Sequence, residues 1–432
     1  MTAAQGERLL DALALVLLKL AVGAAVLHAG FTHVSDDDYA RTVIAQQFAH
    51  APRLDPSGTS WLPAPFWVEG GAMLVFGRSL EVARAIAIVL GAASVVAPYL
   101  AMRAVGLGRV AAVMATVLAM TTPWNAWLGV ATVPEGWVGA VVAAAVLVMP
   151  LEEARPWAAA GVLLGALSRY EAWPACAALA VLCLWKAARG GRIARELACA
   201  AVAVAGPLAW MAWNAHAHGS PLHFVTRVTT FRQGIGAASV PVADKLLGYP
   251  RALVLDMPVA AAFGMAGCIG LIAAPARRRW AWPVGTSLAT LAFLVWGDLH
   301  DGAPTHHAAR ALVAIGWVFV AWGVDAVLTL RRRAGSGARS MAAGLVALAG
   351  VTAGITLLVE PTPPGRSESE DREPQLVRGR DMFERRVRSA TIVPCSFEHF
   401  ALLAAWGAPE RATVLPRTGA PSTPDCPLVT EP

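Results

Sequence analysis

The chain has 432 residues, of which 56% are hydrophobic and only 15% are charged, and its mean hydropathy is +0.54. A soluble globular chain averages roughly 45–50% apolar and about 25% charged residues, so this composition argues against a soluble enzyme. The net charge of +6 comes from 35 basic and 29 acidic residues, and only their positions can show whether it indicates a nucleic-acid partner. The 16 Trp residues favour a protein with many membrane interfaces.

Long apolar segments recur along most of the chain. A bilayer-spanning helix needs about 20 mostly apolar residues. The first segment is too long for a signal peptide and lacks a small-residue cleavage site, so we expect a retained span. The sequence therefore predicts an all-α polytopic membrane protein with about eleven transmembrane helices, and the short pair within 157–188 has a re-entrant loop as its alternative. The predicted spans are 9–31, 81–103, 110–128, 135–150, 157–171, 174–188, 196–214, 252–273, 281–298, 309–330 and 341–359.

Basic residues fall on alternate connections between these spans, as the positive-inside rule expects of cytoplasmic loops. The net positive charge therefore reflects topology, and we expect no nucleic-acid partner. This pattern predicts a multi-pass protein of the inner membrane with a cytoplasmic N-terminus. The residues of the predicted inner loops are Arg103, Arg109, Arg155, Lys186, Arg189, Arg192, Arg195, Arg277, Arg278, Arg279, Arg331, Arg332, Arg333 and Arg339.

An odd number of spans places the C-terminal segment on the outer side. The composition changes abruptly at the Pro-rich stretch 360–364, so we expect a membrane domain over 1–360 and a small extracytoplasmic unit over 361–432. An outer compartment permits disulfides, and we predict a bridge between Cys395 and Cys426. The other cysteines fall within predicted spans and are interpreted as packing residues; they are Cys176, Cys183, Cys199 and Cys268.

Three adjacent carboxylates, Asp36, Asp37 and Asp38, follow the first span and precede a predicted helix that runs to His50. One interpretation is structural, with Ser35 and Asp38 as a capping box and the acids complementing the helix dipole. A cap needs only one or two acids, which leaves room for a chemical role. In that second interpretation one Asp is a general base for an acceptor hydroxyl, or helps to bind a metal or a phosphate.

Two further polar positions stand among apolar residues. Glu135 falls in the first turn of a predicted helix, where it either complements the dipole or takes part in chemistry. Arg169 and Glu171 lie at membrane depth, where ionisable groups usually face an internal cavity and mark function. The guanidinium of Arg169 is suited to binding a phosphate in bidentate fashion.

The first long connection continues with a segment, 55–67, that is rich in turn formers and aromatic residues. It predicts an interfacial loop, followed by a half-buried helix that bears Glu69. We interpret Trp61, Phe66 and Trp67 as membrane-interface anchors, with a sugar-stacking platform as the alternative. Lys19 lies near the middle of the first span, where it either snorkels or pairs with an acid.

Histidines collect in two later connections. His216, His218 and His223 follow the seventh span without a neighbouring carboxylate, which does not favour a metal site. The segment 298–310 mixes acids, imidazoles and a guanidinium, a mixture that suits an anionic leaving group, with solvated loop decoration as the alternative. Its candidate phosphate ligands are His306, His307 and Arg310.

The order of these features resembles the GT-C superfamily of membrane glycosyltransferases, in particular the protein O-mannosyltransferases and the lipid A aminoarabinose transferase. In that branch an acidic motif after the first span precedes a Tyr and an interfacial helix, as the Asp-Asp-Asp-Tyr run ending at Tyr39 does here. Two further motifs extend the resemblance over about residues 10–330. They comprise Phe76, Gly77, Ser79 and Arg84 before the second span, and Trp213, Asn214, Gly219, Ser220, Pro221 and Leu222 after the seventh.

The resemblance implies inverting transfer of a sugar from a polyprenyl-phosphate donor to an acceptor lipid, glycan or protein at the outer face of the membrane. Asp37 is then the expected base, with Asp36 and Asp38 as substitutes, and Glu135 is a second acid that orients the acceptor or a metal. A divalent metal is a candidate cofactor. The candidates for the donor phosphate are Arg169, His306, His307 and Arg310.

Two other functions stay open from the residues alone. A transporter or flippase of a lipid-linked substrate usually keeps ionisable groups near the bilayer midplane, where this sequence places only Lys19. An oligosaccharide ligase or polymerase would depend on a basic outer loop late in the chain. The connection 215–251 supplies such residues, namely Arg227, Arg232, Lys245 and Arg251.

Overall fold

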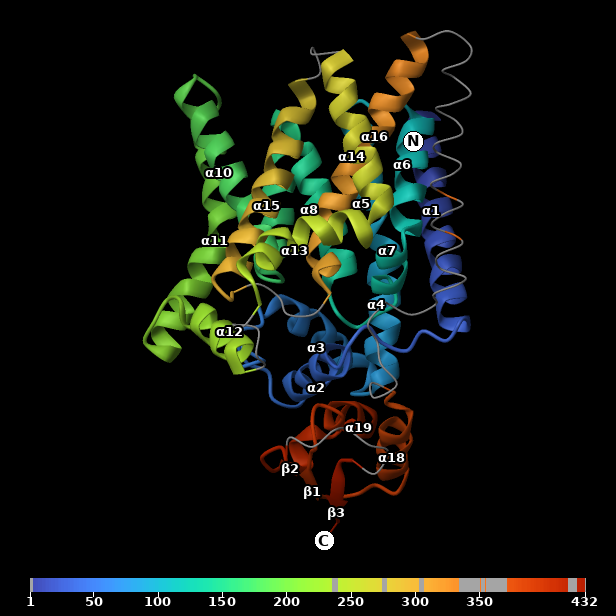
Figure 1. Ribbon diagram of the computed structural model, residues 1–432, viewed down its shortest axis with the longest axis vertical. Helices are drawn as coiled ribbons and strands as arrows, with labels where there is room; N and C mark the ends of the chain where they lie inside the picture. The colour runs from blue at the N-terminus through green and yellow to red at the C-terminus, as the bar shows by residue number, and fades with distance from the viewer. Residues whose placement is uncertain are drawn as a thin grey trace.

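The computed structural model of the chain is a long helical bundle with a small mixed unit at one end (Figure 1). It describes residues 3–234, 240–273, 278–302, 307–333, 350, 354, 371–418 and 426–431. Most of the predicted span 341–359 lies outside the described residues, as do the domain boundary near 360, Arg277, Arg339 and His306.

Helices make up the bundle and the connections at its lower end. The N-terminus and the end of α16 lie at the upper end of the bundle, and the C-terminal unit lies below the lower end (Figure 1). The helices are α1 (Ala3–His28), α2 (Asp37–His50), α3 (Ala64–Phe76), α4 (Leu80–Ser94), α5 (Val96–Ala104), α6 (Arg109–Thr121), α7 (Pro123–Leu128), α8 (Glu135–Val148), α9 (Arg155–Ala166), α10 (Trp173–Ala188), α11 (Ile193–His218), α12 (His223–Gly234), α13 (Val242–Leu255), α14 (Pro258–Ala273), α15 (Ala281–Leu299) and α16 (Val313–Arg333), with short 3₁₀ turns η2 (Tyr170–Ala172) and η5 (Ala308–Leu312).

Among the described residues, five helical stretches are long and apolar enough to cross a membrane. They are Gln5–His28, Leu80–Ala104, Tyr170–Ala188, Ile193–His218 and Ala308–Thr329. Several other predicted spans coincide with shorter helices, such as α6 with 13 residues and α8 with 14 residues. The protein is therefore an integral membrane protein with several spans, and the count of eleven stays a prediction.

The predicted span 252–273 is wrong at its start. The chain bends by 93° between α13 and α14, at a break of a few residues. Pro258 begins α14, and a proline both lacks an amide hydrogen and disfavours helical backbone at the residue before it. Residues 252–255 therefore belong to the preceding helix α13, and a straight apolar segment begins only at Pro258.

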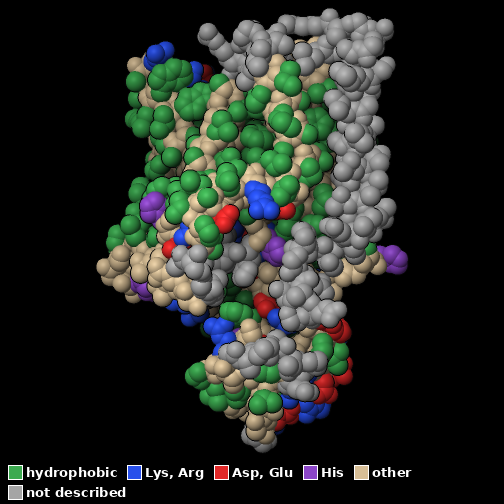
Figure 2. Space-filling view, in the orientation of Figure 1, with side chains coloured by type: hydrophobic (Ala, Val, Ile, Leu, Met, Phe, Trp, Pro, Cys, Tyr) green, Lys and Arg blue, Asp and Glu red, His purple; other side chains and the backbone are tan. Residues whose placement is uncertain are grey.

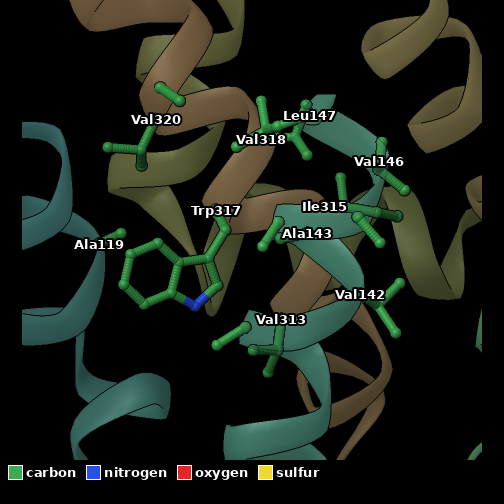
Figure 3. Close-up of a cluster of buried hydrophobic side chains, with 14 of the residues drawn as sticks. Ala119, Val142, Ala143, Val146, Leu147, Val313, Ile315, Trp317, Val318 and Val320 are labelled. Carbon is green, nitrogen blue, oxygen red and sulfur yellow. The ribbon is translucent and has the colours of Figure 1, made fainter. Parts of the chain in front are cut away.

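The core of the bundle is built from small and β-branched residues. Val142, Val146 and Leu147 of α8 face Ile315 and Val318 of α16 in Figure 3. Helices in a membrane gain little from hydrophobic association, so they pack through small residues that let backbones approach. Gly139 shows this contact, because a Cβ there would lie 2.5 Å from a methyl carbon of Val313.

Lys19 of α1 is buried, and its ammonium group has backbone partners. Its Nζ donates to the carbonyl oxygens of Met120 and Asn125, where α6 gives way to α7. The α6–α7 break exposes carbonyl groups that a continuous helix would have bonded internally. Lys19 therefore provides a hydrogen-bond donor to backbone carbonyls at this break, and these described partners are not acids.

The C-terminal unit is not all-helical, contrary to the prediction of an all-α chain. It contains α18 (Glu373–Glu384), α19 (His399–Trp406) and, in its described part, a sheet of order β2-β1-β3. Strand β1 (Ala390–Val393) is rich in β-branched residues, pairs in parallel with β2 (Ala412–Val414) and is antiparallel to β3 (Leu428–Thr430). Cys395 and Cys426 form a disulfide in this unit.

The C-terminal unit packs directly on the long connection that follows α1. Its hydrophobic core includes Trp406 and Met382 and extends to Tyr39 and Val43 of α2. On the face shown in Figure 2, hydrophobic side chains cover the bundle, and charged side chains gather at its upper edge, at this junction and on the C-terminal unit. The acidic motif therefore lies between two folded bodies.

Candidate active site

The three aspartates of the acidic motif have three different environments. Asp36 lies just before α2 and pairs with Arg372 of the C-terminal unit. Asp37 begins α2, and its Oδ2 is 3.1 Å from Nη1 of Arg310. Its side chain is 31% exposed, against 20% for Asp36, while residue Asp38 as a whole is only 3% exposed. Asp37 is thus the most accessible acid of the motif.

Asp38 ties the acidic motif to the bundle. Its Oδ2 accepts the backbone amides of Val34 and Ser35, and its Oδ1 accepts the amide of Thr132 at 3.1 Å. Burial raises the pKa of Asp38 to about 6, although Arg310 and these amides oppose the shift. In the predicted capping box, Asp38 accepts the amide of Ser35 and the Ser35 hydroxyl accepts the amide of Asp38. The structure has the first of these bonds, but the Ser35 hydroxyl accepts a hydrogen bond from Arg310 in place of the second. Asp38 is therefore a structural residue.

Glu135 lies between two arginines at the start of α8. Its Oε1 accepts from Nη2 of Arg310 at 2.6 Å and from Nη1 of Arg169 at 2.8 Å. The Glu135 side chain is fully buried, and its Oε2 has no hydrogen-bond partner among the described residues. Arg169 in turn donates to Glu171 at 2.7 Å. The predicted residues Asp37, Arg310, Glu135 and Arg169 thus form one connected network of charges.

Arg41 joins this network and was missed by the sequence reasoning. Its guanidinium lies 4.5 Å from the ring centre of Trp61 and 5.7 Å from that of Phe66. Nε and Nη1 of Arg41 are buried without a hydrogen-bond partner in the described chain. Arg41 is one helical turn after Asp37, and residues four positions apart lie on the same face of a helix. This spacing is the feature of the sequence that could have indicated Arg41 as a site residue. Trp61 and Phe66 stack on the guanidinium of Arg41, a contact that neither the membrane-anchor nor the sugar-stacking interpretation predicts.

Glu69 of α3 is a second buried acid close to Arg41. Burial raises the pKa of Glu69 to about 8, with Arg41 opposing the shift and Asp38 and Glu135 adding to it. Its Oε2 has no hydrogen-bond partner among the residues described. A carboxyl group that is largely protonated at neutral pH adds little negative charge to the site.

A small cavity of about 30 Å³, with room for one or two water molecules, lies beside the arginine pair. Its polar end is formed by Glu135, Arg169, Glu171 and Arg310, and hydroxyl groups of α15 line one side. The rest of its wall is aliphatic and comes mainly from α8, α10 and α16, and Figure 3 labels five of its residues: Val142, Val146, Val313, Ile315 and Val318. The aliphatic lining comprises Val138, Val142, Val146, Ala172, Ala175, Val313, Ala314, Ile315 and Val318. The cavity therefore has a cationic and acidic end and an apolar interior.

Other predicted site residues lie elsewhere. His307 packs against Trp124, with ring centres 5.3 Å apart, and His306 lies outside the described residues. Two of the basic residues in the connection 215–251 pair with acids of the segment 298–310. These pairs are Arg232 with Asp298 and Lys245 with Asp301, each at 2.7 Å.

The short motifs of the family resemblance have structural contacts here. Ser79 caps α4 by accepting the amide of Val82, and Gly77 before it has a positive φ of 99°. Arg84 donates to the carbonyl of Thr32. Trp213 donates to Oδ2 of Asp55 and so joins α11 to the first outer connection.

The acids of the site do not converge as metal ligands do. The one group of three His, Cys, Asp or Glu ligand atoms found within the described ranges is Cys395, Glu398 and Cys426, and its cysteines form the disulfide. Asp37 and Glu135 both contact the guanidinium of Arg310 instead. This donor set does not fit a metal ion, and we derive no step through one.

No protein family description and no curated protein matches the sequence. Solved structures match its fold. The structure of ArnT from Cupriavidus metallidurans bound to undecaprenyl phosphate has a TM-score of 0.56 at 14% identity, over 94% of this chain and 75% of that chain. The apo state of that protein gives a TM-score of 0.54 at 16% identity with the same coverage.

The archaeal oligosaccharyltransferase AglB from Archaeoglobus fulgidus, in complex with an inhibitory peptide and a dolichol-phosphate, is also similar in fold. It gives a TM-score of 0.50 at 15% identity over 86% of this chain. This chain spans only 58% of the length of that protein. The chain therefore has the fold of the GT-C membrane glycosyltransferases.

Proposed function

We propose that the protein transfers a sugar from a polyprenyl-phosphate donor to an acceptor at the outer face of the membrane. The arginine pair and the aliphatic side chains beside it carry this proposal, because Arg169 and Arg310 lie next to an apolar wall from α8 and α16. A lipid phosphate needs both, since guanidinium groups bind phosphate oxygens in bidentate fashion and the prenyl chain needs an apolar wall. The similar fold of a protein solved with undecaprenyl phosphate supports the same donor class.

Asp37 is the proposed general base. It is the most exposed acid of the motif, and its contact with Arg310 places it beside the polar end of the cavity. In the proposed step Asp37 takes the proton of the acceptor hydroxyl while that oxygen attacks the anomeric carbon. The bond between this carbon and the phosphate oxygen breaks with inversion, and polyprenyl phosphate leaves. Arg310 and Arg169 stabilise the charge on the departing phosphate.

The contacts of the other charged groups weigh against the alternatives. The hypothesis of a ligase or polymerase depends on the basic connection 215–251, yet Arg232 and Lys245 there are paired with Asp298 and Asp301. The hypothesis of a transporter depends on a charge at the midplane of the membrane, yet Lys19 donates hydrogen bonds to backbone carbonyls. We therefore favour chemistry at the outer surface, with the acidic motif and the C-terminal unit on the periplasmic side.

The test is transfer by protein in nanodiscs supplied with polyprenyl-phosphate sugars and a lipid extract as acceptor. General bases contribute roughly 10²–10⁴-fold, so Asp37→Asn should lower turnover by at least about a hundredfold. Asp11→Asn is the matched control, because Asp11 pairs with Arg109 near the start of α1, whereas the acidic motif follows the other end of that helix. Wild-type turnover in Asp37→Asn would remove this residue as the base.

A further inference from the structure

The C-terminal unit reaches the acidic motif through one buried arginine. Nε of Arg372 donates to Oδ1 of Asp36 at 2.7 Å, and Nη2 donates to Oδ2 at 2.7 Å. Arg372 is only 4% exposed, although it is 336 positions away from its partner in the sequence. A bidentate Arg–carboxylate pair fixes the plane of the carboxylate as well as its position.

The side chain of Asp36 makes this pair and no bond to the helix that follows it. Asp36 directly precedes α2 and lies between Ser35 and Asp38 of the capping box. Here its backbone is helical, with φ of −58° and ψ of −16°, and its side chain makes no capping bond. The carboxylate points away from the helix and toward the C-terminal unit.

We propose that Arg372 is a positioning residue: by holding Asp36, it fixes the start of α2 so that the adjacent Asp37 faces Arg310 and the cavity. The two arginines bind neighbouring residues, one from each of the two folded bodies that enclose α2. Without Arg372, the carboxylate of Asp36 is free to cap α2 or to compete with Asp37 for Arg310. This inference rests on the proposed function, because Asp37 is the base assigned there.

Arg372 is itself held by the fold of the C-terminal unit. It directly precedes α18, and Gln375 one turn later donates to the carbonyl of Cys426 at 2.7 Å. Cys426 is joined to Cys395 by the disulfide. The guanidinium that binds Asp36 therefore projects from a helix that is anchored at its first turn.

A second bidentate pair between the same two bodies provides a matched control. Arg78, in the turn before α4, binds Glu410 at 2.8 and 3.0 Å. It joins the C-terminal unit to the bundle as the Asp36–Arg372 pair does, but it does not contact the acidic motif. Loss of this pair affects docking of the unit alone.

The electrostatic surroundings of Asp37 make the proposal measurable by pH. Removal of Arg372 leaves the carboxylate of Asp36 without this counter-charge next to Asp37, so the negative charge around the proposed base increases. The other charged or titratable groups that act on Asp36, Asp37 or Asp38 are Arg310 of η5, Glu69 of α3, Arg169 before η2, Arg41 of α2 and His399 of α19.

The experiment compares Arg372→Gln, Glu410→Gln and the double variant Asp36→Asn/Arg372→Gln in nanodiscs. Misplacement of a reacting group costs up to about a hundredfold in rate, so Arg372→Gln should lower kcat by roughly tenfold to a hundredfold with KM little changed. The acidic limb of its profile of kcat/KM against pH should move to higher pH. The double variant should return the limb to its wild-type position, and Glu410→Gln should leave it there.

Hydrogen exchange of the peptide over residues 31–45 gives a readout without turnover. Arg372→Gln should speed exchange at the start of α2, and Glu410→Gln should leave exchange there unchanged. Equal exchange and an unmoved limb in Arg372→Gln would overturn the inference while wild-type transfer still supports the proposed function. If the wild type transfers no sugar from any polyprenyl-phosphate donor, the proposed function fails, and the exchange data alone decide whether Arg372 positions the motif.

Discussion

The burial of Glu135 between two arginines predicts a large cost for removing its charge. The nitrogens of Arg310 and Arg169 that share its Oε1 lie at 2.6 and 2.8 Å from it, so they are no more than 5.4 Å apart, the sum of the two distances. Two unit charges at that separation repel by about 3 kcal/mol at an effective dielectric constant of about 20. Glu135→Gln keeps the shape of the side chain and removes the charge that offsets this repulsion.

We expect Glu135→Gln to lower the free energy of unfolding by about 3 kcal/mol. Breaking a buried ion pair from one side commonly costs roughly 3–5 kcal/mol. The lower end applies here, because Arg310 keeps Asp37 and Arg169 keeps Glu171 as partners. The measurement is reversible unfolding of the purified protein in mixed micelles, titrated with a denaturing detergent and followed by Trp fluorescence.

Glu153→Gln is the matched control for that measurement. Glu153 also contacts two arginines, Arg192 and Arg195, but its side chain is 78% exposed. Water screens ion pairs at such a surface, so this variant should unfold close to the wild type. A loss in Glu135→Gln that is no larger than in Glu153→Gln would refute the reasoning that the arginines depend on this carboxylate.

Three further predictions concern other parts of the molecule. Burial raises the pKa of Glu69 from 4.5 to about 8. The contribution of Glu69 to stability should therefore fall as pH rises from about 4.5 to 8, because the unfolded chain ionises while the folded chain holds its proton. Detergent unfolding of Glu69→Gln should lack this contribution to the slope, and an equal slope in both proteins would contradict the reasoning. Ala175→Phe places a larger side chain in the apolar wall beside Arg169, so it should raise KM for a long-chain donor by about tenfold, which is about 1.4 kcal/mol of binding free energy, and leave KM for a short-chain donor unchanged; an equal effect on both donors would count against this wall as the prenyl site. Cys395 and Cys426 should react with a membrane-impermeant maleimide only after reduction, and Cys395→Ser should destabilise the C-terminal unit by about 3–4 kcal/mol, as closure of a loop of 31 residues implies; labelling before reduction would rule out the bridge.

Local sequence patterns determined the class of the protein and the residues that carry charge at its outer end. Apolar length and charge placement are properties of short segments, so they predicted a membrane protein with many helices without tertiary information. The acidic motif and the isolated Glu135 and Arg169 stood out for the same reason, since a charge among apolar residues is visible in one dimension. The sequence could not distinguish the three aspartates, because Asp36, Asp37 and Asp38 have the same chemistry and adjacent positions.

The tertiary structure decided which partners each of these charges has. Partners that are far apart in the chain, such as Arg372 for Asp36 and Thr132 for Asp38, distinguish these two acids from the more exposed Asp37. The same contacts assigned Lys19 to a helix end and brought Arg41 into the site. Helix periodicity describes one element at a time, whereas these roles depend on how several elements pack. Only the packed structure shows which charges meet, because burial and pairing together determine the energy of a charge.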